Sequence, residues 1–127
     1  MTFIRALRPD EVTVELIAEP QDESPEACLD EEAAEWARDQ LRRGNQWGWC
    51  TAVVRAKWRD FAGEATLGGC AYRSEEDFVA DSGYFDDMLV EAKNDLQRRL
   101  EETARALEPL VSRESVDDWL VSGVQEA

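Results

Sequence analysis

The sequence predicts an α+β fold, in which helices pack on one face of a three-stranded antiparallel-type sheet to form a two-layer sandwich. Three observations predict it: an alternating strand pattern near the N-terminus, a hairpin pattern in the middle of the chain, and helical periodicity between and after them. The order of elements is β-α-β-β-α. A chain of 127 residues is the size of a single domain, 1–127. We expect its core to span roughly residues 10–110.

The first strand and the first helix follow from periodicity. Residues 11–19 alternate, with Val12, Val14 and Leu16 on one face, and Pro20 ends the strand. Apolar residues then recur at helical spacing: Leu29, Ala33, Trp36, Ala37 and Leu41. The helix can begin after Ser24-Pro25 or at Asp30, and Gly44 is a natural stop.

The central hairpin carries the clearest signal. Residues 47–59 alternate, and the face expected to be buried holds Cys50, Ala52, Val54, Ala56 and Trp58. Residues 60–63 are predicted to form the turn, which pairs Arg59 with Glu64 and Trp58 with Ala65. Gly68-Gly69 inside the returning strand indicates a bulge or a close approach of another backbone.

Two further helices are predicted. Residues 74–81 (SEEDFVAD) begin with a capping Ser and an acidic first turn. A long helix starts near Phe85, and Pro109 is expected to end it near Ala106 or Leu107. Its buried stripe is Phe85, Met88, Leu89, Ala92, Leu96, Leu100, Thr103 and Leu107. Residues 111–127 form a C-terminal extension with a short helix, from which Trp119 and Leu120 are expected to fold back.

The residue types argue against most catalytic chemistry. The chain has no His, which removes the commonest general base and most zinc ligand sets. Cys28, Cys50 and Cys70 contain no CxxC pair, so we expect three reduced, buried cysteines without a metal. We therefore expect no cofactor, no metal and no catalytic residue. An enzyme that uses paired carboxylates is the weakest alternative, with Asp86 and Asp87 as its candidates.

The expected compartment is the cytoplasm. No apolar run approaches the ~20 residues that span a bilayer, and the N-terminus lacks a signal-peptide core. We expect no membrane partner.

Charge is strongly segregated. The chain has 29 acidic and 14 basic residues, a formal charge of −15. Residues 10–35 hold eleven acids and no Lys or Arg, whereas residues 41–59 hold five cations and no acid. Such crowding of like charge costs stability through self-repulsion, so we expect either a basic partner or the protein's own basic hairpin to compensate it. The predicted partner-binding residues are Asp22, Glu23, Glu26, Asp30, Glu31, Glu35, Asp86, Asp87 and Glu91.

Two non-enzymatic functions remain open at this point. In the first, the carboxylates stand in for nucleic-acid phosphates and inhibit a basic host protein. In the second, the protein is a small homodimeric accessory domain whose charge only confers solubility. Its self-association face would be Trp47, Trp49 and Val53, because the sheet is too small to be covered on both sides. Direct nucleic-acid binding is not expected, since phosphate contacts supply most of that affinity and the net charge opposes them.

Three stretches carry a family resemblance. GNQWGWC, LGGCAYRSEEDF and GYFDDMLVEAKNDL, within residues 44–96, resemble a family of small proteins encoded by bacteriophages, prophages and plasmids and by the bacteria that carry them. The resemblance covers roughly residues 10–100. It implies a cytoplasmic protein of mobile-element type and raises the expectation of a counter-defence role, but it assigns no activity, ligand or catalytic residue.

Overall fold

The computed structural model describes residues 4–81 and 83–111 and confirms the α+β class. Strands β1 (Thr13–Glu19), β2 (Cys50–Trp58) and β3 (Phe61–Cys70) form one antiparallel sheet in the order β1-β2-β3. The helices are α1 (Pro25–Cys28), α2 (Glu31–Arg42), α3 (Glu75–Asp81) and α4 (Phe85–Val111). Two short 3-10 turns, η1 (Pro9–Glu11) and η2 (Gln46–Gly48), precede β1 and β2.

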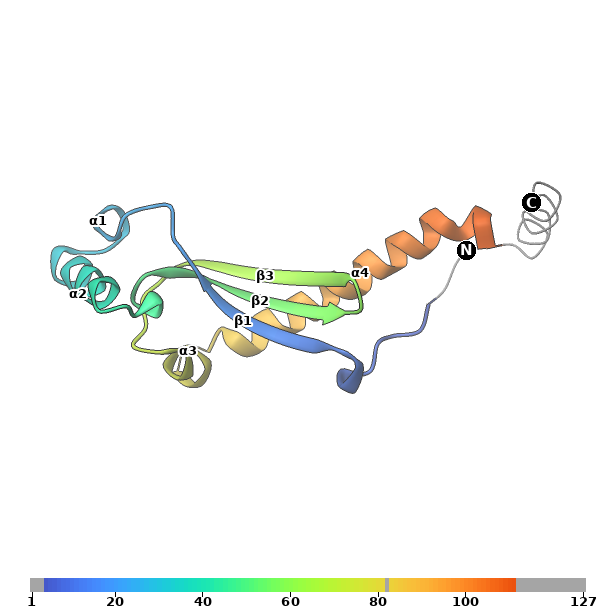
Figure 1. Cartoon of the computed structure of the whole chain (residues 1–127), viewed down its shortest axis with the longest axis horizontal. Coiled ribbons are helices and arrows are strands. Elements are labelled where there is room, and N and C mark those ends of the chain that lie inside the picture. Colours follow the sequence, from blue (N-terminus) through green and yellow to red (C-terminus); the bar gives the residue numbers. More distant parts are fainter. Residues whose placement is uncertain (1–3, 82, 112–127) are drawn as a thin grey trace, which may run out of the picture.

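The long helix α4 covers one face of the sheet, and the core lies between them (Figure 1). Helices α1, α2 and α3 gather at one end of the sheet, where β1 ends, β2 begins and β3 ends. The β2–β3 turn lies at the opposite end, and α4 extends past it. The buried core residues are Cys50, Ala52, Val54, Ala56, Ala65, Cys70, Phe78, Met88, Ala92, Leu96 and Leu100.

The predicted register of the hairpin is wrong. Trp58 pairs with Phe61 and Arg55 with Glu64, so the turn has only two residues, Arg59 and Asp60. Arg59 adopts a φ of 52°, which permits the tight turn, and its guanidinium lies 4.8 Å from the ring centre of Trp58. The shift moves the partner of Trp58 from Ala65 to Phe61, an even number of residues. Residues 64–67 therefore stay on the predicted face, whereas the extra residue at Gly68–Gly69 moves Cys70 from the predicted solvent face to the buried face, opposite Cys50.

The predicted bulge is present. Cys50 pairs with Cys70 but Ala52 pairs with Leu67, which leaves one extra residue in β3 at Gly68–Gly69. Gly69 has a φ of 68°, a conformation that favours glycine. The side-chain oxygen of Gln21 accepts hydrogen bonds from the Gly69 N–H (3.0 Å) and from the Thr51 hydroxyl (2.7 Å). The bulge is thus tied to the segment that leaves β1.

Small residues let α4 lie directly on the sheet. A Cβ at Gly63 of β3 would overlap the backbone nitrogen of Leu96 and the carbonyl oxygen of Ala92. Ala56, which pairs with Gly63, and Ala92 are both fully buried. The helix and the strand therefore meet backbone to backbone at this position.

The helix boundaries agree with most of the local signals. Both expected start points are used, since α1 begins at Pro25 and Asp30 caps α2 by accepting a hydrogen bond from the Ala33 N–H (2.8 Å). The predicted end of the long helix is wrong: α4 continues through Pro109 to Val111. Pro109 lies in the last turn, where it removes one backbone hydrogen bond without breaking the rest of the helix. The predicted short helix after Ser115 lies outside the described residues.

Candidate functional site

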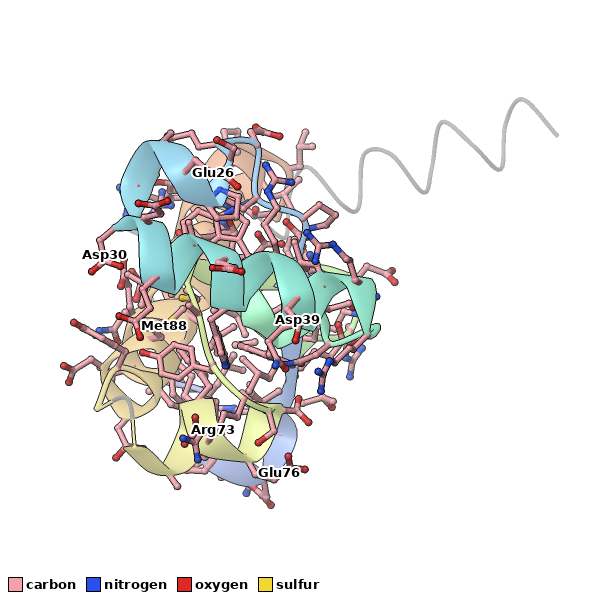
Figure 2. All side chains as sticks on the ribbon, turned by 90° about the vertical axis from the view of Figure 1, so that its left-hand side faces the viewer. Glu26, Asp30, Asp39, Arg73, Glu76 and Met88 are labelled. Atoms are coloured by element: carbon pink, nitrogen blue, oxygen red, sulfur yellow. The ribbon has the colours of Figure 1, made fainter. Side chains whose placement is uncertain are left out.

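The candidate site is the end of the molecule where α1, α2, α3 and the start of α4 lie together (Figure 1). Figure 2 looks onto this end and shows Glu26 of α1, Asp39 of α2 and Glu76 of α3 on different helices around it. Helix starts account for many of the acids at this end, because α2, α3 and α4 each carry two or three acidic residues in the first turn. Negative charge there is favoured by the helix dipole.

A hollow of about 600 Å³ lies between α1 and α2. Glu26 and Arg38 form a two-pronged ion pair across it, with Arg38 Nη2 2.7 Å from Glu26 Oε2. The hydrogen bond from Arg38 lowers the pKa of Glu26 to about 2. Glu31 and Glu35 also line the hollow and are exposed. Of the predicted acids that line this hollow, Glu26 already has its charge balanced by Arg38, whereas Glu31 and Glu35 are exposed to solvent.

The other predicted acids divide by what they contact. Asp30 is the N-cap of α2, and a Glu23 carboxylate oxygen lies 3.1 Å from the Cys28 sulfur. Asp22 is exposed in the loop before α1. Asp86 and Asp87 are exposed in the first turn of α4, which begins at the same end of the sheet as α2. Glu91 is exposed one turn farther along, where it lines a shallow hollow with Glu64 and Arg98. The two sets of predicted residues thus lie on segments that meet at one end of the molecule.

The sequence prediction missed the contribution of α3. Glu75 and Glu76 are exposed in its first turn, and α3 lies at the same end as α2. The acids that follow Ser74 are visible in the sequence, but an acidic first turn by itself predicts only the start of a helix. Their place beside the other acids depends on the end of β3, which the sequence does not locate in space.

The cations of the sheet are paired locally. Arg55 contacts Glu64 (Nε–Oε1 2.7 Å) and Glu15 (Nη1–Oε2 3.5 Å), and Lys57 contacts Glu15 (Nζ–Oε1 2.9 Å). All four side chains lie on the sheet face opposite α4, because Glu15, Arg55 and Glu64 are register partners. These cations therefore do not neutralise the acids of α2 and α3.

The middle of α4 is also paired. Asp95 accepts hydrogen bonds from the Glu64 backbone N–H (3.0 Å) and from Arg99 Nε (3.0 Å), and it pairs with Arg98. These contacts lower its pKa, with the backbone N–H as the main cause. The carboxylate therefore joins α4 to β3 rather than facing a partner.

The predicted self-association face is not an exposed face. Trp49 and Val53 are only 4% and 1% exposed, and Trp47 stacks on Phe78 with ring centres 5.1 Å apart. The loop before α1 holds Trp49, whose Nε1 donates to the Glu23 carbonyl at 2.8 Å. Val53 lies between its strand partners Ile17 and Thr66. Trp47 is covered by α3, Trp49 by the loop before α1 and Val53 by its strand partners, so the premise of the homodimer prediction, an exposed apolar face, is wrong.

The three cysteines differ in burial. Cys50 and Cys70 are buried cross-strand partners, whereas Cys28 is exposed, which corrects the expectation that all three are buried. A hydrogen bond between the two thiols, together with burial, raises the pKa of Cys50. Hydrogen bonding to Glu23 raises the pKa of Cys28. The hydrogen bond from Cys50 lowers the pKa of Cys70, so only the environments of Cys28 and Cys50 disfavour a thiolate.

In native protein we expect one thiol to react quickly with a disulfide reagent and two thiols to react slowly. Cys28 should react first with a disulfide reagent, because Cys50 and Cys70 become accessible only when the sheet opens. Denatured, unreduced protein should give three free thiols. A count of one, which would indicate a Cys50–Cys70 disulfide, or stoichiometric zinc in the purified protein, would contradict the prediction.

The carboxylates of the described residues are all at least partly accessible. No Asp or Glu side chain within residues 4–80 and 83–110 is buried, and Asp86 and Asp87 are exposed. In the same two ranges, no group of three or more acidic or Cys side chains is placed to hold a metal ion. The absence of enzyme activity stays a prediction. No helix in the described part of the chain is long and apolar enough to cross a membrane.

The fold thus defines a class: an α+β protein with one long helix on a three-stranded sheet and an acidic helical end. Comparisons of the chain with protein-family models, with curated proteins and with solved structures find no match.

Proposed function

We propose that the protein is a non-enzymatic acidic binding protein of mobile-element type, which occupies the nucleic-acid-binding channel of a basic host protein and inhibits it. The proposed contact surface, here called the acidic end, is made of exposed carboxylates on three helices. They are Glu31, Glu35, Glu75, Glu76, Asp86, Asp87 and Glu91.

One observation carries the proposal: like charges are spaced one helical turn apart at the acidic end. Glu31 and Glu35 on α2, and Asp87 and Glu91 on α4, are i,i+4 pairs of acids. Each such pair costs roughly 0.2–0.5 kcal/mol of helix stability. Farther along the same helix, Arg98 and Glu102 form an i,i+4 pair of opposite charge. Glu91 also lies four residues before Asp95, but Asp95 is paired with Arg98 and Arg99. The unrelieved repulsion therefore lies in the first turns of α4, where a basic partner would relieve it.

Rigidity also supports the proposal. The carboxylates stand on helices, and α3 and α4 are anchored to the core by Phe78, Met88 and Ala92. A partner therefore loses less conformational entropy than it would by binding a disordered acidic tail. Complementary charge accelerates association and orients the two surfaces. The family resemblance supports a host defence or nucleic-acid-handling protein as the partner.

The experiment is affinity capture from a bacterial lysate, with tagged protein, at about 0.05 M and about 0.5 M salt. We expect a basic protein that is retained at low salt, released at high salt and displaced by added duplex DNA. A partner that survives high salt, or that DNA does not displace, would contradict nucleic-acid mimicry.

A charge-matched pair of variants locates the surface. The test variant is Glu31→Gln/Glu35→Gln/Asp87→Asn/Glu91→Gln. The control is Asp10→Asn/Asp60→Asn/Glu101→Gln/Glu102→Gln, which removes the same number of charges away from the acidic end. We expect the test variant to weaken binding by about tenfold or more, at 0.2–1 kcal/mol per contact, and the control to change it little. Equal effects of the two variants would show that only net charge matters and would refute the surface.

A further inference from the structure

The end of the molecule opposite the acidic end holds an apolar groove of about 340 Å³. It lies beside the β2–β3 turn, where the second half of α4 runs past the end of the sheet (Figure 1). Its walls come from the N-terminal segment, the end of β2 and α4. They are Ile4, Arg5, Leu7, Trp58, Leu100, Thr103, Ala104 and Leu107.

The apolar stripe of α4 continues beyond the part of the helix that the sheet covers. Leu96 is fully buried and Leu100 is 9% exposed, but Leu107 is 49% exposed. Within the described residues, therefore, the sheet covers this stripe only in the first part of the helix. An apolar groove continuous with an exposed stripe is typical of a docking site.

We propose that the groove is the docking site for the chain's own C-terminal segment, residues 112–127, with Trp119 and Leu120 as the inserted side chains. The segment reads VDDWLV over residues 116–121, so Val116, Trp119 and Leu120 have the i, i+3, i+4 spacing of an apolar helix face. Hydrophobic burial of this face supplies the driving force.

The chain is long enough to return to the groove. Ala104 lies seven residues before Val111, or roughly 10 Å along the helix axis. The five residues from Val111 to Val116 span up to about 17 Å when extended, and the three helical residues from Val116 to Trp119 add roughly 5 Å. The segment can therefore reverse direction and still place Trp119 beside Ala104.

The charges around the groove also favour the C-terminal segment as its occupant. Arg5 lines the groove, and Arg59 lies over the ring of Trp58, another wall residue. Arg5 pairs with Glu11, but Arg59 has no ion-pair partner among the described residues. Asp117 and Asp118 immediately precede Trp119, so a docked segment brings two acids to the groove beside Arg59.

A thermal double-mutant cycle on the full-length chain tests the contact. Trp119→Ala should lower the Tm by about 4 °C or more, and Leu107→Ala should lower it less in the Trp119→Ala background than in the parent. Leu110→Ala is the matched control, because Leu110 is 67% exposed and does not line the groove. Its effect should be the same in both backgrounds. An unchanged Tm for Trp119→Ala would overturn the proposal. So would a Leu107→Ala substitution that lowers the Tm equally in the parent and in the Trp119→Ala background.

Fluorine NMR of protein labelled with 5-fluorotryptophan gives a second measurement that does not depend on stability. Trp119→Phe identifies the Trp119 resonance among the five tryptophans. We expect the chemical shift of that resonance to differ from that of free 5-fluorotryptophan. It should change in the Leu107→Ala variant but not in the Leu110→Ala variant. A resonance at the free position in every variant would refute docking.

Light scattering separates the segment from the other occupant of such a groove, a second copy of the chain. We expect the mass of one chain, 14.4 kDa, at all concentrations. Twice that mass, with a Tm that rises with protein concentration, would assign the groove to a dimer interface and overturn the proposal.

Discussion

Replacement of Gly63 with Ala should destabilise the protein by about 3 kcal/mol, the upper part of the usual range for overpacking. The added Cβ would overlap the backbone nitrogen of Leu96 and the carbonyl oxygen of Ala92, and neither atom belongs to a flexible side chain. Only a movement of α4 away from β3 can relieve the overlap. Such a movement would loosen the main contact between the two layers.

Denaturant titration followed by circular dichroism measures the effect. Gly68→Ala is the matched control, since Gly68 lies in the same strand and its Cβ would meet only the side-chain amide of Gln21. We expect the control to cost far less than Gly63→Ala. A stability for Gly63→Ala within about 0.5 kcal/mol of the parent would mean that α4 does not lie this close to β3.

Replacement of Phe78 with Ala should cost about 3–5 kcal/mol, because a fully buried aromatic ring would leave a cavity. Phe78 of α3 stacks on Trp47 and meets Tyr72 edge-on, with both pairs of ring centres 5.1 Å apart. The three rings join α3 to η2, which precedes β2, and to the segment that follows β3. The same variant should therefore release Glu75 and Glu76 from their place at the acidic end.

The matched control is Val79→Ala in the next position of α3, where the side chain is 42% exposed. Its cost should stay within about 0.5 kcal/mol. Thermal and chemical denaturation measure stability, and near-ultraviolet circular dichroism reports the aromatic cluster. If Phe78→Ala and Val79→Ala cost the same, Phe78 is not the anchor of α3.

Much of the fold could be predicted because its signals are local. Alternation located β1 and both hairpin strands, and the buried face of β2 is the predicted one. Capping residues located the helix starts, with Asp30 and Ser74 each accepting a hydrogen bond from the first turn that follows. The bulge followed from Gly68-Gly69, since only a glycine adopts the φ of Gly69 without strain.

The candidate site was predictable only in part. Asp86, Asp87 and Glu91 are exposed as expected, and the first turn of α4, with Asp86 and Asp87, lies at the same end as α2, with Glu31 and Glu35. Glu26 was expected to be free but is paired with Arg38, twelve residues away. A charge run in the sequence records which residues are acidic, but an ion pair depends on how α1 and α2 fold against each other.

The strand alternation, the helix starts and the uneven distribution of charge are all readable from the amino-acid sequence, because each of them depends on residues that are close together in the chain. Only the tertiary structure decided the hairpin register, where the backbone of Arg59 and the packing of Trp58 on Phe61 select a two-residue turn. It also decided the burial of Trp49, which the loop before α1 covers. The acidic end arises in the same way: antiparallel pairing brings the end of β1, the start of β2 and the end of β3 to one side, and the helices attached to them follow.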